Sequence, residues 1–215
     1  MKFEIFVNGP LQCNAFVIFN EGSSNALIID PGQEPDEILG FLEKKKLKPL
    51  MLFHTHAHID HIGASRKLKD LLGVPIYLHE GDRELYENIH MQAFMLDAKA
   101  EDPASVDVFL KDGDQVVCRE LSEKPLFRVI HTPGHSQGSV CYYSEIFGKP
   151  VLISGDTLFR ESVGRTDLPG GNPHLIVPSI RNKLLTLPPE TLVYPGHGPS
   201  TTLEYERDHN YFLTR

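Results

Sequence analysis

The chain has 215 residues, of which 40% are hydrophobic and 23% are charged, and its formal net charge is -8. This composition is ordinary for a soluble globular protein, and the length favours one large domain over two small ones. The negative charge argues against nucleic acid and against an anionic membrane surface as partners.

The N-terminal segment has one lysine and then alternates apolar and polar residues, so it lacks the apolar core of a signal peptide. No later run approaches the length of a transmembrane helix. The three cysteines, Cys13, Cys118 and Cys141, have no CxxC spacing and are interpreted as reduced thiols packed as small hydrophobic side chains. We therefore expect a cytoplasmic protein.

The first third of the chain alternates apolar runs with turns, which predicts strands over 3–7, 14–19 and 26–30. Residues 34–48 have the spacing of an amphipathic helix. The continuous apolar run over 49–56 predicts a strand that is covered on both faces. A short helix over 65–73 and a strand over 74–79 follow.

Residues 81–102 have helical propensity and predict a helical excursion near the site. The second half returns to strands, predicted over 114–118, 126–132, 139–144, 150–156 and 191–196, with a helix over 174–187. No repeat, linker or break in composition divides the chain. We predict a single domain over 1–215, with sheets covered by helices.

The stretch MLFHTHAHIDHIG, residues 51–63, carries an unusual density of histidine at the end of an apolar run. His56 and His58 stand two positions apart, so on an extended segment both side chains point to the same side. Asp60 and His61 follow where the strand gives way to a turn. Imidazole nitrogen and carboxylate oxygen are ligands that zinc accepts. Taken alone, the motif also allows a histidine-rich loop without a metal.

Three further candidates stand beside glycines at the predicted ends of later strands. They are His135 in HTPGHSQGS, Asp156 in LISGDTLF and His197 in VYPGHGP. Glycine lets the backbone turn sharply there and leaves room for a side chain to point inward. With the first motif, five histidines and two aspartates are available, which is enough for two adjacent metal ions that share one carboxylate.

The segments THAHIDH, TPGHSQGS, SGDTLF and PGHGP, in this order, resemble the motifs of the metallo-β-lactamase superfamily. The resemblance covers nearly the whole chain and is greatest to a short bacterial branch of glyoxalase II-like (hydroxyacylglutathione hydrolase-like) enzymes. It implies an α/β fold, an αββα sandwich of two mixed sheets covered by helices. It also implies a chain without the C-terminal helical domain of full-length glyoxalase II.

The resemblance implies a role for each ligand candidate. His56, His58 and His135 would bind the first metal ion, and Asp60, His61 and His197 the second, with Asp156 bridging both. Zinc is the expected metal, although iron and manganese accept the same ligands. Asp30 in LIIDPG matches an earlier family motif and would orient a ligand histidine, the alternative being a turn-forming aspartate before Pro-Gly.

The implied activity is hydrolysis of a small-molecule thioester such as S-lactoylglutathione, by attack of a metal-bridging hydroxide. Asp60 would orient the water or accept its proton as a catalytic residue. Arg165 matches the position of a basic residue that contacts glutathione, and Arg160 is a second candidate for substrate binding. A surface ion pair is the alternative for Arg165, because Asp167 replaces an aromatic residue of the family.

Other functions stay open at this point. GRTD, within SVGRTD, also resembles sulfur dioxygenases that use a single iron on a persulfide, and lactone or β-lactam hydrolysis is a third possibility. A purely structural metal protein is disfavoured, because structural zinc sites are usually rich in cysteine.

Overall fold

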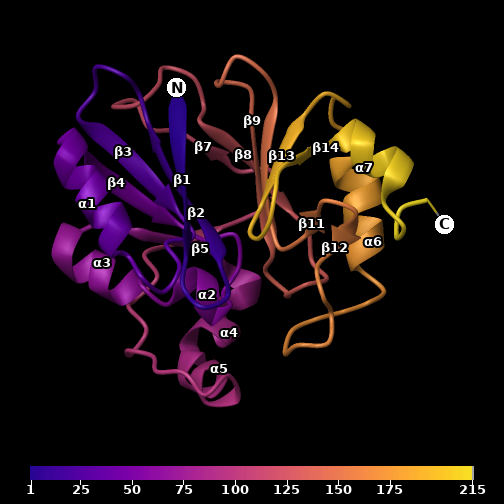
Figure 1. Ribbon diagram of the computed structural model, residues 1–215, viewed down its shortest axis with the longest axis horizontal. Helices are drawn as coiled ribbons and strands as arrows, with labels where there is room; N and C mark the ends of the chain where they lie inside the picture. Colours follow the sequence, from indigo (N-terminus) through magenta and orange to yellow (C-terminus); the bar gives the residue numbers. More distant parts are fainter. Residues whose placement is uncertain (215) are drawn as a thin grey trace.

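The computed structural model describes residues 1–214 and consists of two six-stranded sheets that face each other (Figure 1). The first sheet has its strands in sequence order: β1 (Lys2–Asn8), β2 (Cys13–Phe19), β3 (Asn25–Ile29), β4 (Lys48–Phe53), β5 (Ile76–His79) and β6 (Val108–Leu110). Pairing is antiparallel between the first three strands and parallel from β3 to β6. The sheet is therefore mixed, as predicted.

The second sheet is also mixed and comes from the second half of the chain. Its order is β14 (Thr201–Thr202), β13 (Leu192–Pro195), β10 (Val151–Gly155), β9 (Val140–Ser144), β8 (Phe127–His131) and β7 (Gln115–Val116). Only β10 and β13 pair in parallel. A separate small hairpin joins β11 (Leu158–Phe159) and β12 (Ser162–Val163).

The core between the sheets follows from the alternation of side chains along the strands. In β2, Phe16 and Ile18 point into the space between the sheets, whereas Ala15 and Val17 point to the outer helices. Phe16 meets Phe127 and Tyr142 of the second sheet in the same buried cluster. Because both faces of β2 are covered, its sequence is apolar at nearly every position.

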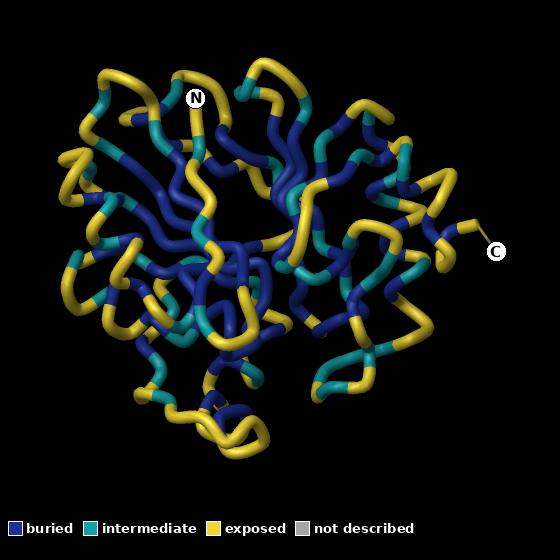
Figure 2. The backbone as a smooth tube through the Cα atoms, viewed as in Figure 1, coloured by how far each residue is buried: buried dark blue, intermediate teal, exposed yellow. Residues whose placement is uncertain are grey.

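Helices cover the outer face of each sheet and complete the αββα sandwich (Figure 1). On the first sheet these are α1 (Asp36–Lys45) and α3 (Ser65–Leu72), which contribute Ile38, Leu42 and Leu68 to the core. On the second sheet they are α6 (Ile176–Ser179), the π-helical segment η2 (Ile180–Leu184) and α7 (Leu203–His209). Figure 2 shows the buried strands lying between these more exposed layers.

The remaining helices gather at one end of the sandwich. They are α2 (Ile59–Ile62), the 3-10 turn η1 (Glu80–Asp82), α4 (Arg83–Glu87) and α5 (Ile89–Met95). Strands β3, β4 and β5 are parallel, so their carboxyl ends all lie at this end. The helical excursion predicted within residues 81–102 is thus confirmed, with its last helix ending at Met95.

Several boundaries differ from the sequence-based prediction. The strand predicted over 49–56 ends at Phe53, so the histidines that follow lie on a loop. The helix predicted over 34–48 is shorter, because Lys46 takes a left-handed conformation and ends it. The strands β6, β11, β12 and β14 were not predicted. Each has only two or three residues, too few for an alternating pattern to be visible.

Cys13, Cys118 and Cys141 are buried and form no disulfide, as expected from their spacing. Within residues 1–214, no helix is long and apolar enough to cross a membrane.

Candidate metal centre

The first group of candidate ligands lies on the loop that leaves β4. The second sheet holds this loop: the Tyr142 hydroxyl donates to the His54 carbonyl at 2.6 Å, and the Val140 N–H donates to the Thr55 carbonyl at 2.8 Å. His58 keeps an extended backbone and then acts as the N-cap residue of α2. The helix begins immediately afterwards, which brings Asp60 and His61 back over the loop.

The second group comes from the opposite sheet. His135 lies in the turn between β8 and β9, Asp156 directly follows β10, and His197 follows β13. Since β10 and β13 are parallel neighbours, their carboxyl ends are adjacent, and Asp156 and His197 emerge side by side. The two sheets thus deliver their ligand candidates to the same end of the sandwich.

His56, His58 and His135 form one compact cluster. The Nε2 atom of His135 lies 2.8 Å from Nδ1 of His58 and 3.2 Å from Nε2 of His56. Ligand atoms bound to a tetrahedral zinc ion at its usual distance lie about 3.3 Å from one another. The three nitrogen atoms therefore have about the spacing that a single metal ion requires.

Asp60, His61 and His197 form a second cluster beside the first. The Nε2 atom of His197 lies 3.0 Å from Oδ2 of Asp60 and 3.2 Å from Nε2 of His61. Asp156 stands between the clusters: its Oδ2 is 3.5 Å from His135 Nε2, and its Oδ1 is 3.4 Å from His61 Nε2. The structure therefore brings all seven predicted ligand residues together.

Two further observations agree with a metal at this position. Within residues 1–214, the buried Oδ1 atom of Asp156 makes no hydrogen bond of good geometry, its nearest charged neighbour being Nε2 of His61 at 3.4 Å, and a cation would satisfy it. In addition, a Cβ atom at Gly196 would overlap the Asp156 carboxylate and lie 2.7 Å from Cε1 of His61. The chain thus keeps this space clear next to the carboxylate, and the donor set fits a divalent cation.

In His135 and His197 the ring nitrogen that faces away from the clusters has a backbone acceptor. Nδ1 of His135 lies 2.8 Å from the Arg165 carbonyl, and Nδ1 of His197 lies 3.2 Å from the Gln12 carbonyl. An acceptor at Nδ1 places the proton there and leaves the lone pair of Nε2 free for a metal. The surrounding backbone therefore selects the tautomer that metal binding needs.

Asp30 is fully buried and lies directly behind the second cluster. Its Oδ2 is 3.1 Å from Nδ1 of His61, and its carboxylate also accepts hydrogen bonds from the backbone N–H and the hydroxyl of Thr55, at 2.8 and 2.6 Å. Asp30 has a positive φ of 48°. These contacts are those that a residue orienting His61 would make.

Burial and neighbouring charge set the protonation of the candidate ligands before a cation binds. Burial acts to lower the pKa of His61 and His197, but the carboxylates beside them raise the net pKa of both, so these two imidazoles give up a proton when a metal binds. Burial lowers the pKa of His58 to about 3 and that of His56 well below its ordinary value, so both imidazoles are neutral at pH 7. Burial acts to raise the pKa of Asp60, but His61 and His197 beside it hold the net pKa below the usual range. Neutral imidazoles and ionised carboxylates are the forms that bind metals.

Asp82, which the sequence did not suggest, ties the two ligand loops together. It is fully buried, and its Oδ2 accepts hydrogen bonds from the Ala57 N–H at 2.9 Å and from the Ser136 hydroxyl at 2.7 Å. Its Oδ1 accepts from the Gly138 N–H at 2.5 Å. Ala57 lies between two candidate ligands, and Ser136 follows His135. The available signal was an acid beside a glycine three positions after a strand, in HEGD.

A cavity of about 630 Å³ opens above the two clusters. His58, Asp60, His135, Asp156 and His197 all reach it and form its floor. Helices α4 and α5 border one side, and residues 159–169 border the other. The volume lies within the range of small-molecule sites.

Arg165 borders this cavity, whereas Arg160 does not. The Arg165 guanidinium donates to both carboxylate oxygens of Asp167, at 2.7 and 2.8 Å, and both side chains are exposed. Arg160 lies over the ring of Tyr205 at 5.3 Å and lines an adjoining hollow, which shares Phe159, Ser162 and His197 with the cavity. Substrate binding by either arginine stays a prediction. The contacts of Arg165 are those of a surface ion pair, which was the alternative to substrate binding.

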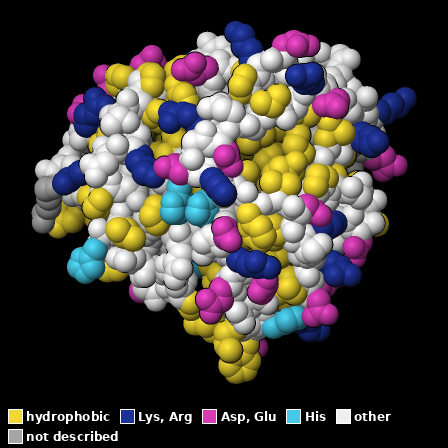
Figure 3. All heavy atoms as spheres, turned by 180° about the vertical axis from the view of Figure 1, so that it is seen from behind, with side chains coloured by type: hydrophobic (Ala, Val, Ile, Leu, Met, Phe, Trp, Pro, Cys, Tyr) yellow, Lys and Arg dark blue, Asp and Glu magenta, His cyan; other side chains and the backbone are white. Residues whose placement is uncertain are grey.

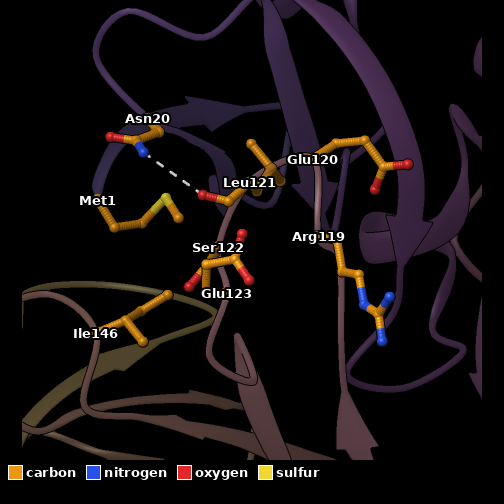
Figure 4. Close-up of a pocket in the computed structure, with 8 residues that line it drawn as sticks. All are labelled: Met1, Asn20, Arg119, Glu120, Leu121, Ser122, Glu123 and Ile146. Atoms are coloured by element: carbon orange, nitrogen blue, oxygen red, sulfur yellow. Dashed lines mark hydrogen bonds between the residues drawn. The ribbon is translucent and has the colours of Figure 1, made fainter.

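Another hollow, of about 450 Å³, lies near the start of β1 and the end of β2, at the end of the sandwich opposite the ligand loops (Figure 4). There Asn20 donates to the Leu121 carbonyl at 3.5 Å. Its described lining residues include no histidine or cysteine, so it offers no donor set comparable to that of the 630 Å³ cavity.

The chain has close relatives among known proteins. It is 39% identical over 214 residues to the probable metallo-hydrolase YqgX of Bacillus subtilis, which covers 99% of this chain and 98% of that protein. It is 33% identical over 214 residues to the hydroxyacylglutathione hydrolase GloC of Haemophilus influenzae, with the same coverage of 99% and 98%.

Two solved structures have nearly the same backbone. The B3 metallo-beta-lactamase BLEG-1 is 39% identical, with a TM-score of 0.89 over 100% of both chains. TTHA1623 in a di-iron-bound form is 40% identical, with a TM-score of 0.87 over 98% of this chain and 100% of that one.

Residues 8–197 match the family described as the metallo-beta-lactamase superfamily, whose members bind metal ions. The motifs, the αββα sandwich and the full-length relatives agree on this family and confirm the resemblance seen in the sequence. The chain therefore belongs to the metallo-β-lactamase superfamily and is one of its metallo-hydrolases.

Proposed function

We propose that this protein hydrolyses thioesters at a centre of two divalent metal ions, with zinc as the expected metal. The observation that carries the proposal is the position of Asp156 between the two clusters. Its Oδ1 lies 3.4 Å from Nε2 of His61, and its Oδ2 lies 3.5 Å from Nε2 of His135 and 3.6 Å from Nε2 of His197. A carboxylate between two ligand clusters suits a pair of metal ions rather than one. The relative named hydroxyacylglutathione hydrolase supports a thioester as substrate.

His56, His58 and His135 would hold the first ion, Asp60, His61 and His197 the second, and Asp156 both. Two such ions would supply a water molecule of lowered pKa and stabilisation for negative charge on the substrate oxygen. The same nitrogen and oxygen donors accept iron or manganese. The similarity to the di-iron form of TTHA1623 makes iron a realistic second choice.

Asp60 is the proposed catalytic residue. Its carboxylate is held in place by His197, whose Nε2 lies 3.0 Å from Oδ2, and it faces the cavity. His61 and His197 keep its pKa low, so the carboxylate stays ionised at neutral pH. An ionised carboxylate at this position would orient the attacking water by accepting a hydrogen bond from it.

The residues around the cavity favour a thioester over an amide. Among the described lining residues, the carboxylates are Asp60 and Asp156, both within the ligand clusters, and no lysine, tyrosine or cysteine is present. An amine leaving group must be protonated as it departs. A thiolate leaves without this help, because a thiol has a pKa of about 8.5. A cavity without a further acid therefore suits a thiolate leaving group.

The test is thiol release by zinc-loaded protein from S-lactoylglutathione and from the acetyl and hexanoyl thioesters of N-acetylcysteamine. We expect turnover of at least one substrate, and a loss of about a thousandfold or more in Asp156→Ala. Asp70→Ala, which removes an exposed carboxylate of α3, is the matched control and should keep full activity. If two metals are bound per chain and no thiol is released from any of the three, the proposal is wrong.

A second candidate is β-lactam hydrolysis, which the similarity to BLEG-1 favours. The same preparation should be assayed with a chromogenic cephalosporin. Faster turnover of the cephalosporin than of every thioester would replace the first proposal with the second.

A further inference from the structure

The walls of the 630 Å³ cavity differ sharply from its floor. One wall is apolar and consists of Ile59 of α2, Leu85 of α4, and Met95 and Leu96 at the end of α5. Facing them are Phe159, Val163, Leu168 and Pro169. Leu11, at the tip of the β1–β2 hairpin, also lines the cavity. A substrate above the floor would therefore meet apolar side chains on both sides.

The one buried amide in this lining is not free to bind a substrate. Oε1 of Gln92 accepts from the Ile59 N–H at 2.9 Å, and its Nε2 donates to the carbonyls of Ala57 and Leu85, both at 2.9 Å. Gln92 thus joins α5 to the ligand loop and has little hydrogen-bonding capacity left. Apart from the floor and Gln92, the polar side chains among the described lining residues are those of Ser162 and Arg165.

The charge around the cavity does not suit an anionic arm. A glutathione thioester carries two carboxylates and one ammonium group, and its recognition needs cations. Arg165 is the only arginine or lysine among the described lining residues, and Asp167 occupies its guanidinium in a bidentate pair. The paired charges cancel, so the wall offers no net positive charge to a carboxylate.

The mouth of the cavity exposes large apolar side chains. Met95 is 57% exposed, Leu96 52% and Leu11 48%. In Figure 3 hydrophobic side chains gather at the lower tip of the molecule, where α5 lies. Apolar side chains that are continuous with the lining of a catalytic cavity gain free energy when an apolar ligand covers them.

We infer that the cavity selects thioesters with an uncharged, apolar arm next to the scissile bond, in preference to glutathione thioesters. The inference rests on the proposed thioesterase function and adds the class of substrate. The apolar arm lies either on the acyl group or on the thiol, since both would extend from the floor between the same walls.

Two series of substrates distinguish these arms. The first contains acetyl to octanoyl thioesters of N-acetylcysteamine, and the second contains acetyl thioesters of thiols from ethanethiol to octanethiol. We expect kcat/KM to rise along one series by up to about fourfold for each methylene group that becomes buried. A rise in the first series assigns the arm to the acyl group, and a rise in the second assigns it to the thiol. If both series are flat, or if S-lactoylglutathione is the best substrate, the inference is wrong.

A pair of matched variants tests whether the named wall is responsible. Leu96→Asp places a charge in the wall, whereas Leu71→Asp makes the same change at an exposed leucine of α3 outside the lining. We expect Leu96→Asp to reduce the ratio of octanoyl to acetyl kcat/KM at least tenfold and Leu71→Asp to leave it unchanged. Equal ratios in both variants would overturn the assignment of the wall.

A binding measurement separates this inference from the proposed function. Calorimetry with zinc-loaded protein compares octanoate with acetate, the product carboxylates, and octanethiol with ethanethiol, the product thiols. Tighter binding of a long-chain member by at least tenfold supports the apolar arm even if no thioester is hydrolysed, in which case only the function fails. If neither long-chain compound binds more tightly than its short partner, the inference fails, whatever the turnover.

Discussion

The floor and the walls of the cavity differ in how firmly the structure holds their side chains. Beneath the floor, buried side chains hold the ligands in place: Asp30 contacts His61, and Asp82 connects the loop of His56 and His58 to that of His135. On the walls, residues such as Met95 and Leu96 are exposed and make no side-chain hydrogen bonds. The buried network therefore fixes the ligands, and the exposed wall residues Met95 and Leu96 contribute little to the fold. Ile59 and Leu85 of the same wall pack in a hydrophobic cluster instead. Substrate preference can change here without loss of the metal centre.

Acid should affect the floor far more than the walls. Burial lowers the pKa of His54 to about 4 and that of His58 to about 3, from an unfolded value of 6.5. Because the unfolded chain binds these protons first, their contribution to stability is complete above pH 6.5 and is lost as the pH falls towards 4. We expect the free energy of unfolding of metal-free protein to fall by up to about 3 kcal/mol per histidine over this range.

Urea unfolding at several pH values measures this loss. His58→Gln should show a shallower dependence on pH, whereas His209→Gln, a change at an exposed histidine, should behave as the unmodified protein does. A free energy of unfolding that stays constant from pH 6.5 to 4 would contradict the prediction.

Metal loading should stabilise the same floor. The cation would satisfy Asp156 Oδ1 and bind only the folded chain, because the ligands come from both sheets. At a free metal concentration a thousandfold above Kd, we expect a gain of about 4 kcal/mol in the free energy of unfolding. Thermal unfolding with and without a chelator tests this, with Asp156→Asn showing a smaller gain. An unchanged Tm after complete metal removal would count against a centre of this kind.

Loss of the Asp82 carboxylate should loosen both ligand loops. In Asp82→Ala the buried N–H groups of Ala57 and Gly138 lose their acceptor, at a cost of about 3 kcal/mol. We also expect metal affinity to fall by about 10- to 100-fold, as when a residue that orients metal ligands is removed. Metal titration and urea unfolding report the two effects separately. Asp208→Ala, at an exposed position of α7, is the control, and equal metal affinities in the two variants would refute the positioning role.

The smallest expected effect is on the wall, at the ion pair of Arg165 and Asp167. Asp167→Asn frees the guanidinium, so kcat/KM for S-lactoylglutathione should rise about threefold, while that for a neutral thioester stays constant. Asp70→Asn, which breaks the exposed pair with Arg66, should change neither value. An equal change for charged and neutral substrates would show that Asp167 acts on the loop rather than on charge.

The sequence was most informative where chemistry and chain geometry coincide. The spacing of His56 and His58 and the glycines beside Asp156 and His197 pointed to loops at strand ends, which is where these side chains lie. Convergence of the loops could be expected because the carboxyl ends of parallel neighbouring strands lie together. The strand was nevertheless predicted too long. The hydroxyl of Tyr142, on the other sheet, donates to the His54 carbonyl just after the strand ends, and the apolar run does not reveal this contact.

The roles of Asp82 and of the wall residues could not be predicted from the sequence, for physical reasons. The role of Asp82 depends on N–H groups that come from positions 57 and 138, a pairing that no local pattern encodes. Arg165 and Asp167 stand two residues apart, yet only the turn between them decides whether they meet. The apolar lining combines residues of α4, α5 and the segment after β10, each of which looks like an ordinary surface or core residue in sequence.

The origin of the ligands in both sheets also bears on the order in which the protein is made. A nascent chain first presents His56 to His61, later His135 and Asp156, and His197 only after β13 has been synthesised. A partly synthesised chain therefore offers an incomplete set of donors, and the last ligand arrives with a strand next to the middle of the second sheet. We expect the chain to bind its full set of metal ions only after both halves of the molecule have docked.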